Sequence, residues 1–466
     1  MKKDSNPITL GTLPIGKLLV QYSVPAIIAM VATSLYNIID SIFIGRGVGP
    51  LALTALAVNL PLMNLVIAFA TLVSVGGATI SSIFLGQQNV KRATDVINNV
   101  MIMCLIHSVV FGGVTLFFLD DILVVFGATK ETLHLAHEFM EVVLYATPLA
   151  YVFIGMNNLM RSTGYPTKAM ISALISVVVN VILAPIFIFK LEMGMRGAAL
   201  ATVGGQFCGF IWVLSHFLSK KSFVHLDFRS RWLSWNIVKK MYGIGLSPFL
   251  MNITACFVVV FLNKALLNSC GNQVDGNMAV GAYGILNRVA MFFVMLVLGI
   301  TQGMQPLLGY NFGAMKWDRV KKTLKLGIIA GLSVTSVGWL LTEMMPDTLS
   351  MMFTTDESLI SIAREGFRLF FICFPLVGVQ IIITNFFQSI GKPALSIFLS
   401  LTRQLLFLLP LLAILPRYFG VTGVWASVGC SDFLAFVLAL VTILLVMKRL
   451  SKKYNTHSDS INITTN

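Results

Sequence analysis

The chain contains twelve long apolar runs, and these fall into two halves of six runs that repeat each other. A membrane-spanning helix needs roughly 20 apolar residues, and the runs are long enough to supply that length. The clearest repeat pairs residues 161–166 (RSTGYP) with residues 388–393 (QSIGKP), a shift of 227 residues. Further pairs at nearly the same shift are Pro25 with Pro248, Gly86 with Gly309, Pro148 with Pro375, and Gly197 with Gly423.

The fold class predicted from these runs is an all-α membrane protein with twelve transmembrane helices in two pseudo-symmetric lobes of six. The apolar character is continuous and does not alternate, so the runs indicate helices and not barrel strands. Only 11% of the 466 residues are charged and 57% are hydrophobic, whereas a soluble domain has about 25% charged residues. The runs span approximately 20–43, 51–85, 96–119, 132–154, 169–189, 198–218, 241–268, 280–308, 326–345, 359–385, 394–415 and 422–447.

The repeat also predicts the organisation of the chain. We expect an N-lobe over residues 1–218, a basic cytoplasmic linker over 219–240, a C-lobe over 241–447 and a cytoplasmic tail over 448–466. Six spans return the chain to the side on which they began, so the two lobes are expected to be related by an axis near the membrane normal. Duplicated membrane units of this kind are typical of transporters.

The net charge of +14 is placed unevenly along the chain. If the N-terminus is cytoplasmic, 23 of the 33 basic residues fall in inside segments, and few fall in outside loops. This bias predicts that both termini are cytoplasmic. It also indicates anionic membrane lipid, and not nucleic acid, as the partner of the charge.

The sequence favours neither an enzyme nor a cofactor-binding protein. The six cysteines are scattered without a CxxC pair, so neither a zinc site nor a disulfide is expected. There is no nucleotide-binding glycine loop and no nucleophile elbow. His134, His137, Glu138 and Glu141 have helical spacing, but we interpret them as polar groups on a helix start outside the lipid rather than as metal ligands.

Four segments resemble those of the MATE (multidrug and toxic compound extrusion) transporters. They are residues 36–45 (YNIIDSIFIG), 161–164 (RSTG), 180–188 (NVILAPIFI) and 305–311 (QPLLGYN). The similarity covers about residues 15–447 and is greatest to the bacterial DinF-like branch. It implies a V-shaped, monomeric transporter of the bacterial cytoplasmic (inner) membrane. Such a protein exports amphipathic, often cationic drugs in exchange for H⁺ or Na⁺.

The resemblance also implies an ion-coupling site in the N-lobe. The matching positions are Asp40 in the first run, Asn180 and Ala184 in the fifth, and Thr202 in the sixth. Relatives commonly carry an aspartate at the position of Ala184, so this chain lacks one anionic ligand. A single carboxylate suffices for a proton, whereas Na⁺ prefers several oxygens. We therefore favour H⁺ coupling, with Na⁺ as the alternative.

A charge in the middle of a bilayer costs about 2.5–3.5 kcal/mol or more, so each such residue needs an explanation. Asp40 is interpreted as a group on which a proton and a cationic drug compete, the alternative being a structural hydrogen bond or ion pair. Asn180 and Thr202 either assist Asp40 or simply bridge helices. Arg403 and Asp432 lie at similar depth in neighbouring runs, which predicts a structural ion pair, with C-lobe coupling or substrate contact as the alternative.

Further polar residues in the spans are candidates for the substrate cavity. These are Asn37, Asn64, Arg288, Gln302 and Gln305. His107 stands alone in the third run and is interpreted as a helix-packing group. The alternative function is a flippase for a lipid-linked oligosaccharide. A flippase should have a strongly cationic interior for pyrophosphate, and Arg288 and Arg403 are the only obvious deep arginines.

Overall fold

The computed structural model describes residues 7–219, 222–227, 233–269 and 273–464, with the backbone alone at 273–275 and 451–464. Every element in these ranges is helical. The first half contains η1 (Pro7–Gly11), α1 (Ile15–Gly47), α2 (Pro50–Gly86), α3 (Val90–Phe117), α4 (Leu119–Val125), α5 (Leu133–Tyr145), α6 (Thr147–Ser162), α7 (Pro166–Pro185), η2 (Ile186–Lys190) and α8 (Gly194–Leu218). The second half contains α9 (Trp235–Ser269), α10 (Gln273–Gly313), α11 (Trp317–Met344), α12 (Pro346–Met351), α13 (Glu357–Phe370), α14 (Phe374–Ser389), α15 (Pro393–Leu401), η3 (Thr402–Leu408) and α16 (Leu409–Thr464).

The helices account for the twelve predicted crossings. Nine helices in the described residues are long and apolar enough to span a membrane, and two bent helix pairs raise the number to eleven. The last of the nine, over 393–450, itself holds two crossings, because the backbone of Gly420 has non-helical angles (φ 58°, ψ −136°) that divide α16. Glycine tolerates this positive φ since it has no Cβ.

The fourth span of each half is broken, which the continuous apolar runs did not predict. α5 and α6 meet at an angle of 57°, and α13 and α14 at 54°. Pro148 and Pro375 each occupy the second position of the helix after the break. Proline fits a first helical turn, but it disfavours helical geometry in the residue before it. The repeated proline therefore places the same bend in both lobes.

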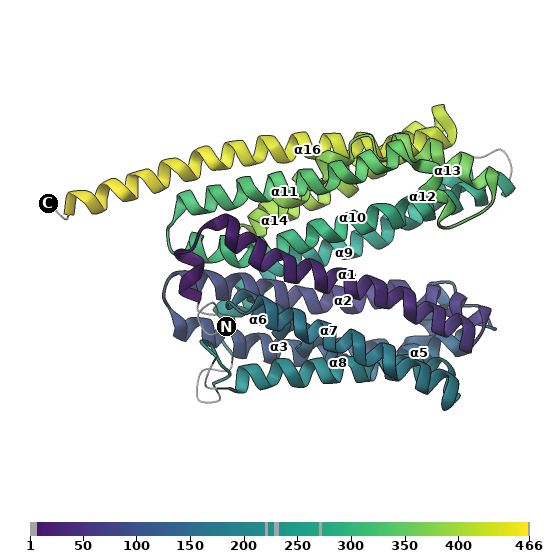
Figure 1. Cartoon of the computed structure of the whole chain (residues 1–466), viewed down its shortest axis with the longest axis horizontal. Helices are drawn as coiled ribbons and strands as arrows, with labels where there is room; N and C mark the ends of the chain where they lie inside the picture. Colours follow the sequence, from purple (N-terminus) through teal and green to yellow (C-terminus); the bar gives the residue numbers. More distant parts are fainter. Residues whose placement is uncertain (1–6, 220–221, 228–232, 270–272, 465–466) are drawn as a thin grey trace.

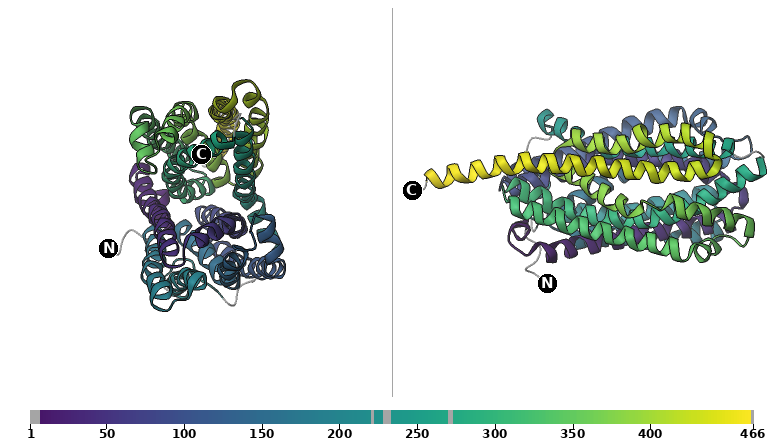
Figure 2. Two further views of the ribbon diagram at one scale, coloured as in Figure 1. Left: turned by 90° about the vertical axis from the view of Figure 1, so that its right-hand side faces the viewer. Right: turned by 90° about the horizontal axis from the view of Figure 1, so that it is seen from above.

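The two halves form two lobes that lie side by side and diverge toward the end opposite the termini (Figure 1). Figure 2 shows the same separation in the view from that opposite end. One continuous hydrophobic core includes residues of both lobes, and its C-lobe members come from the half nearest the termini, such as Leu307 and Phe386. The other half of the C-lobe has a separate core around Phe367 and Trp425. The lobes therefore share a core only near the termini.

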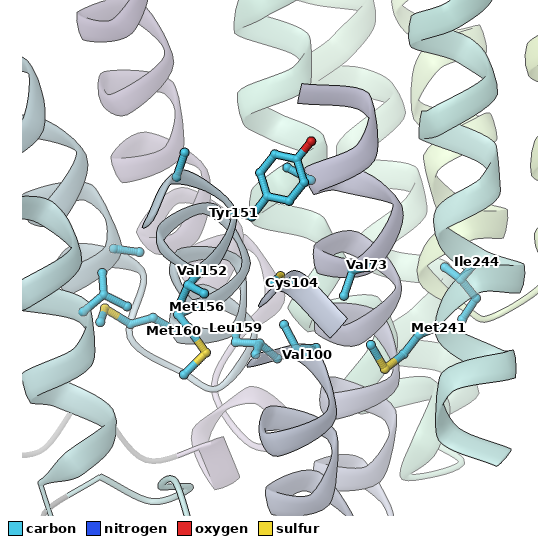
Figure 3. Close-up of a cluster of buried hydrophobic side chains, with 14 of the residues drawn as sticks. Val73, Val100, Cys104, Tyr151, Val152, Met156, Leu159, Met160, Met241 and Ile244 are labelled. Atoms are coloured by element: carbon cyan, nitrogen blue, oxygen red, sulfur yellow. The ribbon is translucent and has the colours of Figure 1, made fainter. Parts of the chain in front are cut away.

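Small residues allow the lobes to approach closely at the shared end. A Cβ added at Gly245 of α9 would lie 1.7 Å from the carbonyl oxygen of Leu72 on α2, and one at Gly76 would lie 2.0 Å from that of Met241. Figure 3 shows Met241 and Ile244 of α9 next to Val73 of α2 and the N-lobe core. Small residues are a common means of close helix approach in membranes. The seam between α2 and α9 thus depends on glycine at both positions.

Helices extend into the segments that we expect to be linker and tail. α9 begins at Trp235, inside the segment expected to be linker, and α16 continues as a helix to Thr464. In Figure 1 this last helix extends beyond the rest of the molecule. The domain limits themselves remain a prediction.

Candidate coupling site and its surroundings

Asp40 lies on α1 and is buried, with 6% of its surface exposed. Its Oδ1 atom has no hydrogen-bond partner, and no basic side chain forms an ion pair with Asp40, among the residues that the structure describes. Removing a carboxylate from water penalises its charged form. The side chain is therefore neither directed at lipid nor neutralised by a neighbouring cation.

A hydrogen-bond network links three helices one turn from Asp40. Tyr36 Oη lies 3.0 Å from Thr202 Oγ1, and Asn180 Nδ2 donates to the same oxygen at 3.2 Å. The Thr202 hydroxyl donates to the carbonyl oxygen of Ala198 at 3.2 Å. Since its single proton is used there, Tyr36 must be the donor in the first contact. Thr202 Oγ1 thus accepts two hydrogen bonds and donates one.

Close packing of α7 against α8 makes this network possible. A Cβ added at Gly205 of α8 would lie 2.3 Å from the carbonyl oxygen of Ser176 on α7. Ala184 follows Asn180 by one helical turn on α7, so the two residues share a face, and both are buried. The position at which relatives carry an aspartate therefore lies inside the N-lobe, next to the predicted site.

The predicted cavity residues occupy two kinds of position. Asn37 and Asn64 are exposed, and Asn64 Nδ2 lies 3.9 Å from Cys256 Sγ across the two lobes. Arg288 is also exposed, with its guanidinium carbon 5.8 Å from the centre of the Phe353 ring. Their role in substrate binding stays a prediction.

Gln302 and Gln305 lie at the seam between the lobes. Gln305 Nε2 donates to Thr79 Oγ1 at 2.7 Å and to the carbonyl oxygen of Val75 at 3.4 Å, both on α2. Gln302 Nε2 approaches Met30 Sδ of α1 at 4.0 Å. In this arrangement both amides are contacts between lobes and not free groups of an open cavity. A role in substrate binding would require the lobes to move.

Arg403 and Asp432 are in contact, as their depth in neighbouring runs predicted. Arg403 Nε donates to Asp432 Oδ1 at 2.8 Å, and the Asp432 side chain is 3% exposed. Arg403 lies on the π-helical segment η3, and Asp432 lies on α16 beyond the Gly420 break. A buried pair removes much of the cost of both charges. Whether the pair is structural or takes part in coupling stays a prediction.

Two contacts were not anticipated from the sequence. Tyr36 belongs to the polar network. The one sequence signal for this is its position four residues before Asp40, on the same helix face. His107 Nε2 of α3 forms a hydrogen bond with the hydroxyl of Tyr242 on α9, which joins the two lobes. Sequence separation of 135 residues concealed this pair.

The histidines and acids near the start of α5 contact one another and Arg196. His137 Nδ1 lies 2.6 Å from Asp120 Oδ1, and Glu138 lies 3.5 Å from His134 and 3.6 Å from Arg196. Among the described residues, no group of three potential metal ligands gathers at one point. These contacts accord with an interpretation as a polar surface.

Twelve crossings in two repeated lobes, with polar groups buried between helices, define a multi-pass membrane transporter. The family model MatE matches the chain twice, over residues 25–186 and 252–414, and the starts of the two matches differ by the 227 residues of the internal repeat. The chain belongs to the MatE family of transporters.

Similar proteins were found along nearly the whole chain. The multidrug export protein MepA of Staphylococcus aureus strain NCTC 8325 / PS 47 is 26% identical over 454 residues, covering 96% of this chain and 98% of the relative. MepA of Staphylococcus haemolyticus is 25% identical, with the same coverage. A solved structure of an outward-facing multidrug resistance MATE transporter matches with a TM-score of 0.90 at 22% identity, covering 97% of this chain and 100% of the other. The structural match supports the fold alone.

Proposed function

We propose that this protein exports amphipathic, often cationic compounds across the bacterial cytoplasmic membrane in exchange for a cation, with H⁺ favoured over Na⁺. The proposal places both termini in the cytoplasm and treats the monomer as the functional unit. Support for multidrug export comes from the relatives named multidrug export protein. Support for the orientation comes from the excess of basic residues in the segments that lie on the same side of the membrane as the termini.

The observation that carries the coupling proposal is the buried carboxylate of Asp40 with its unpartnered Oδ1. Such a group is stabilised either by a proton or by a nearby cation. If binding of one excludes the other, proton entry can release a cationic substrate. Exchange then requires that proton and substrate prefer different arrangements of the lobes, because a ligand with equal affinity for both arrangements shifts neither.

The preference for H⁺ follows from the number of available oxygens. Ala184 supplies no carboxylate, and both lone pairs of Thr202 Oγ1 are taken by Tyr36 and Asn180. A dehydrated Na⁺ would need several oxygen ligands, whereas a proton needs only one oxygen of Asp40. The hydrogen-bond network therefore supports a proton as the coupling ion.

The test uses purified protein in vesicles that contain a fluorescent cationic drug. Transport is measured with a pH gradient alone and with a Na⁺ gradient alone at fixed pH. We expect the pH gradient to drive transport, and Asp40→Asn to reduce transport to the level of protein-free vesicles. Asp318→Asn is the matched control, because Asp318 has the same chemistry but a side chain that is 99% exposed.

Two results would contradict the proposal. Transport driven by Na⁺ at fixed pH would overturn the choice of ion. Unchanged transport by the Asp40→Asn variant would remove Asp40 from the mechanism.

The flippase alternative gains less support. A pyrophosphate-bearing lipid would need unpaired cations facing it, whereas Arg403 is occupied by Asp432. Two deep arginines were considered from the sequence. Of these two, Arg288 is the one that has no acidic partner among the described residues.

A further inference from the structure

Lys168, an exposed residue at the start of α7, contacts His216 near the end of α8 and forms no ion pair among the described residues. Lys168 Nζ lies 3.2 Å from His216 Nδ1 and 5.0 Å from the centre of the Tyr165 ring. A lysine that is fixed but not neutralised by the protein can bind an anion from outside.

The hydrogen bonds around His216 determine how the lysine is held. Ser222 Oγ donates to the carbonyl oxygen of Val224 at 2.7 Å, so it accepts from His216 Nε2 at 3.2 Å. The other ring nitrogen, Nδ1, is then free of a proton and accepts from Lys168. His216 and Ser222 are both buried, with 7% of each exposed. The buried chain of hydrogen bonds orients Lys168 and leaves its other N–H groups available.

A hollow of about 230 Å³ with both polar and apolar surface lies beside this lysine. Its lining consists of Lys168, Trp212, Ser215, His216, Ser219 and Ser222. Trp212 is 38% exposed, and its Nε1 donates to the carbonyl oxygen of Lys168 at 3.3 Å. Tryptophan is enriched at the level of lipid headgroups, where one side of the ring is apolar and the other is wet. The protons of Ser215 Oγ, Ser222 Oγ and Trp212 Nε1 are already donated within the protein, so Lys168 Nζ is the donor for a phosphate.

A second hollow, of about 270 Å³, follows along the same helix. It is lined entirely by the apolar side chains of Ile171, Leu174, Ile175, Val178 and Val179. Ile171 and Ile175 lie one and two turns beyond Lys168, close to the same face of α7. At a rise of 1.5 Å per residue, Lys168 to Val179 spans about 16 Å, close to one leaflet of a hydrocarbon core about 30 Å thick.

We propose that Lys168 and the apolar hollow of α7 form a binding site for one anionic phospholipid, with the phosphate at Lys168 and an acyl chain along Ile171–Val179. The two hollows have the polarity and the order that such a lipid presents from headgroup to tail. The site belongs to the N-lobe alone, because the repeat places Leu395 at the position equivalent to Lys168. The assignment of this site to the cytoplasmic leaflet rests on the orientation proposed above. Lipid retention in detergent does not depend on that orientation.

The test measures lipids retained by the full-length protein in detergent, using native mass spectrometry after incubation with equal amounts of phosphatidylglycerol and phosphatidylcholine. We expect preferential retention of phosphatidylglycerol. Lys168→Gln should reduce this preference about fivefold, the factor that corresponds to about 1 kcal/mol per basic residue at an anionic surface. Lys91→Gln is the matched control, because Lys91 is exposed at the same end of the molecule. Lys168→Arg should retain the preference.

A second variant tests the acyl half of the site without changing charge. Ile175→Trp fills the apolar hollow and should reduce retention of phosphatidylglycerol, while a soluble anion would be unaffected. This variant keeps the proposal testable if Lys168→Gln does not fold. Equal retention of both lipids, or equal effects of Lys168→Gln and Lys91→Gln, would overturn the proposal. Displacement of the lipid by millimolar inorganic phosphate, with no effect of Ile175→Trp, would identify a soluble-anion site instead.

Discussion

Arg319, at the start of α11, donates a hydrogen bond to the backbone of Leu10, which precedes α1 of the other lobe. Arg319 Nη2 donates to the carbonyl oxygens of Leu10 and Leu13 at 2.9 and 2.7 Å, and Nε donates to Asn311 Oδ1 at 2.8 Å. Lys316 Nζ adds a hydrogen bond to the carbonyl oxygen of Gly11 at 2.8 Å. The segment that precedes α1 is therefore hydrogen-bonded to the C-lobe at the end where the lobes meet.

We predict that Arg319→Gln favours separation of the lobes at this end. Hydrogen bonds to a charged group contribute about 1.5–3 kcal/mol, so losing them should change the ratio of the two lobe arrangements by about tenfold or more. The measurement is the distance between spin labels at Lys130→Cys and Thr355→Cys, which are exposed in the N-lobe and C-lobe, in a background without the six native cysteines. The two labels lie between α4 and α5 and between α12 and α13, at the end opposite the termini (Figure 1). Because separation of the lobes at the termini brings these opposite ends together, we expect shorter distances between the labels to become more populated.

The internal repeat provides the control for this experiment. Arg92 is equivalent to Arg319 by the 227-residue shift, but its side chain is exposed and its guanidinium lies 5.8 Å from the Phe84 ring. Arg92→Gln removes the same charge and should leave the distance distribution unchanged. If both variants shift it equally, the effect is one of surface charge and not of the Arg319 contacts.

Gly245→Ala should weaken the seam between the lobes. The added Cβ would meet the Leu72 carbonyl oxygen at 1.7 Å, and relief of such crowding typically costs about 1–3 kcal/mol. Gly243 lies on the same helix, but its nearest neighbour would be Pro393 Cγ at 3.9 Å. Gly243→Ala should therefore be neutral or slightly stabilising. Thermal unfolding in detergent distinguishes the two, and equal midpoints would contradict the packing argument.

Thr202→Val should impair the protein more than Tyr36→Phe. Valine leaves two donors, on Tyr36 and Asn180, without their acceptor, and an unsatisfied buried group costs about 1–3 kcal/mol. Phenylalanine removes a single donor and leaves Thr202 with its bond from Asn180. Drug efflux and thermal stability should both follow this order. A larger loss with Tyr36→Phe would indicate that the tyrosine hydroxyl acts beyond this network.

Removing one member of the Arg403–Asp432 pair should destabilise the C-lobe strongly. An uncompensated buried charge costs about 3–5 kcal/mol, so Arg403→Ala and Asp432→Ala should each lower thermal stability more than the double substitution does. A double-mutant cycle measures this difference. If the double variant is stable but does not transport, the pair takes part in coupling. Additive losses of stability would show that the two charges do not interact.

The number of spans and the duplication could be predicted from the sequence, because both depend on local properties. About 20 apolar residues in succession suffice to predict a span, as at 169–189, where α7 and η2 together cover 166–190. Depth in the membrane also predicted the contact between Arg403 and Asp432, since both charges lie in neighbouring apolar runs. The breaks before Thr147 and Phe374 were not predicted, because the hydropathy is continuous across them.

The contacts between lobes depend on how two distant surfaces meet, and no local pattern encodes that. Gln305 reads as a polar residue in a span, yet its partner Thr79 lies 226 residues away. His107 and Tyr242 are likewise joined only when α3 packs near α9. The sequence alone determined a duplicated helical membrane protein with one acid in its first span. Only the tertiary structure decided that Asp40 is buried, that its Oδ1 has no hydrogen-bond partner among the described residues, and that the lobes meet at the end bearing the termini. The reason is that burial and close approach are set by packing between segments far apart in the chain.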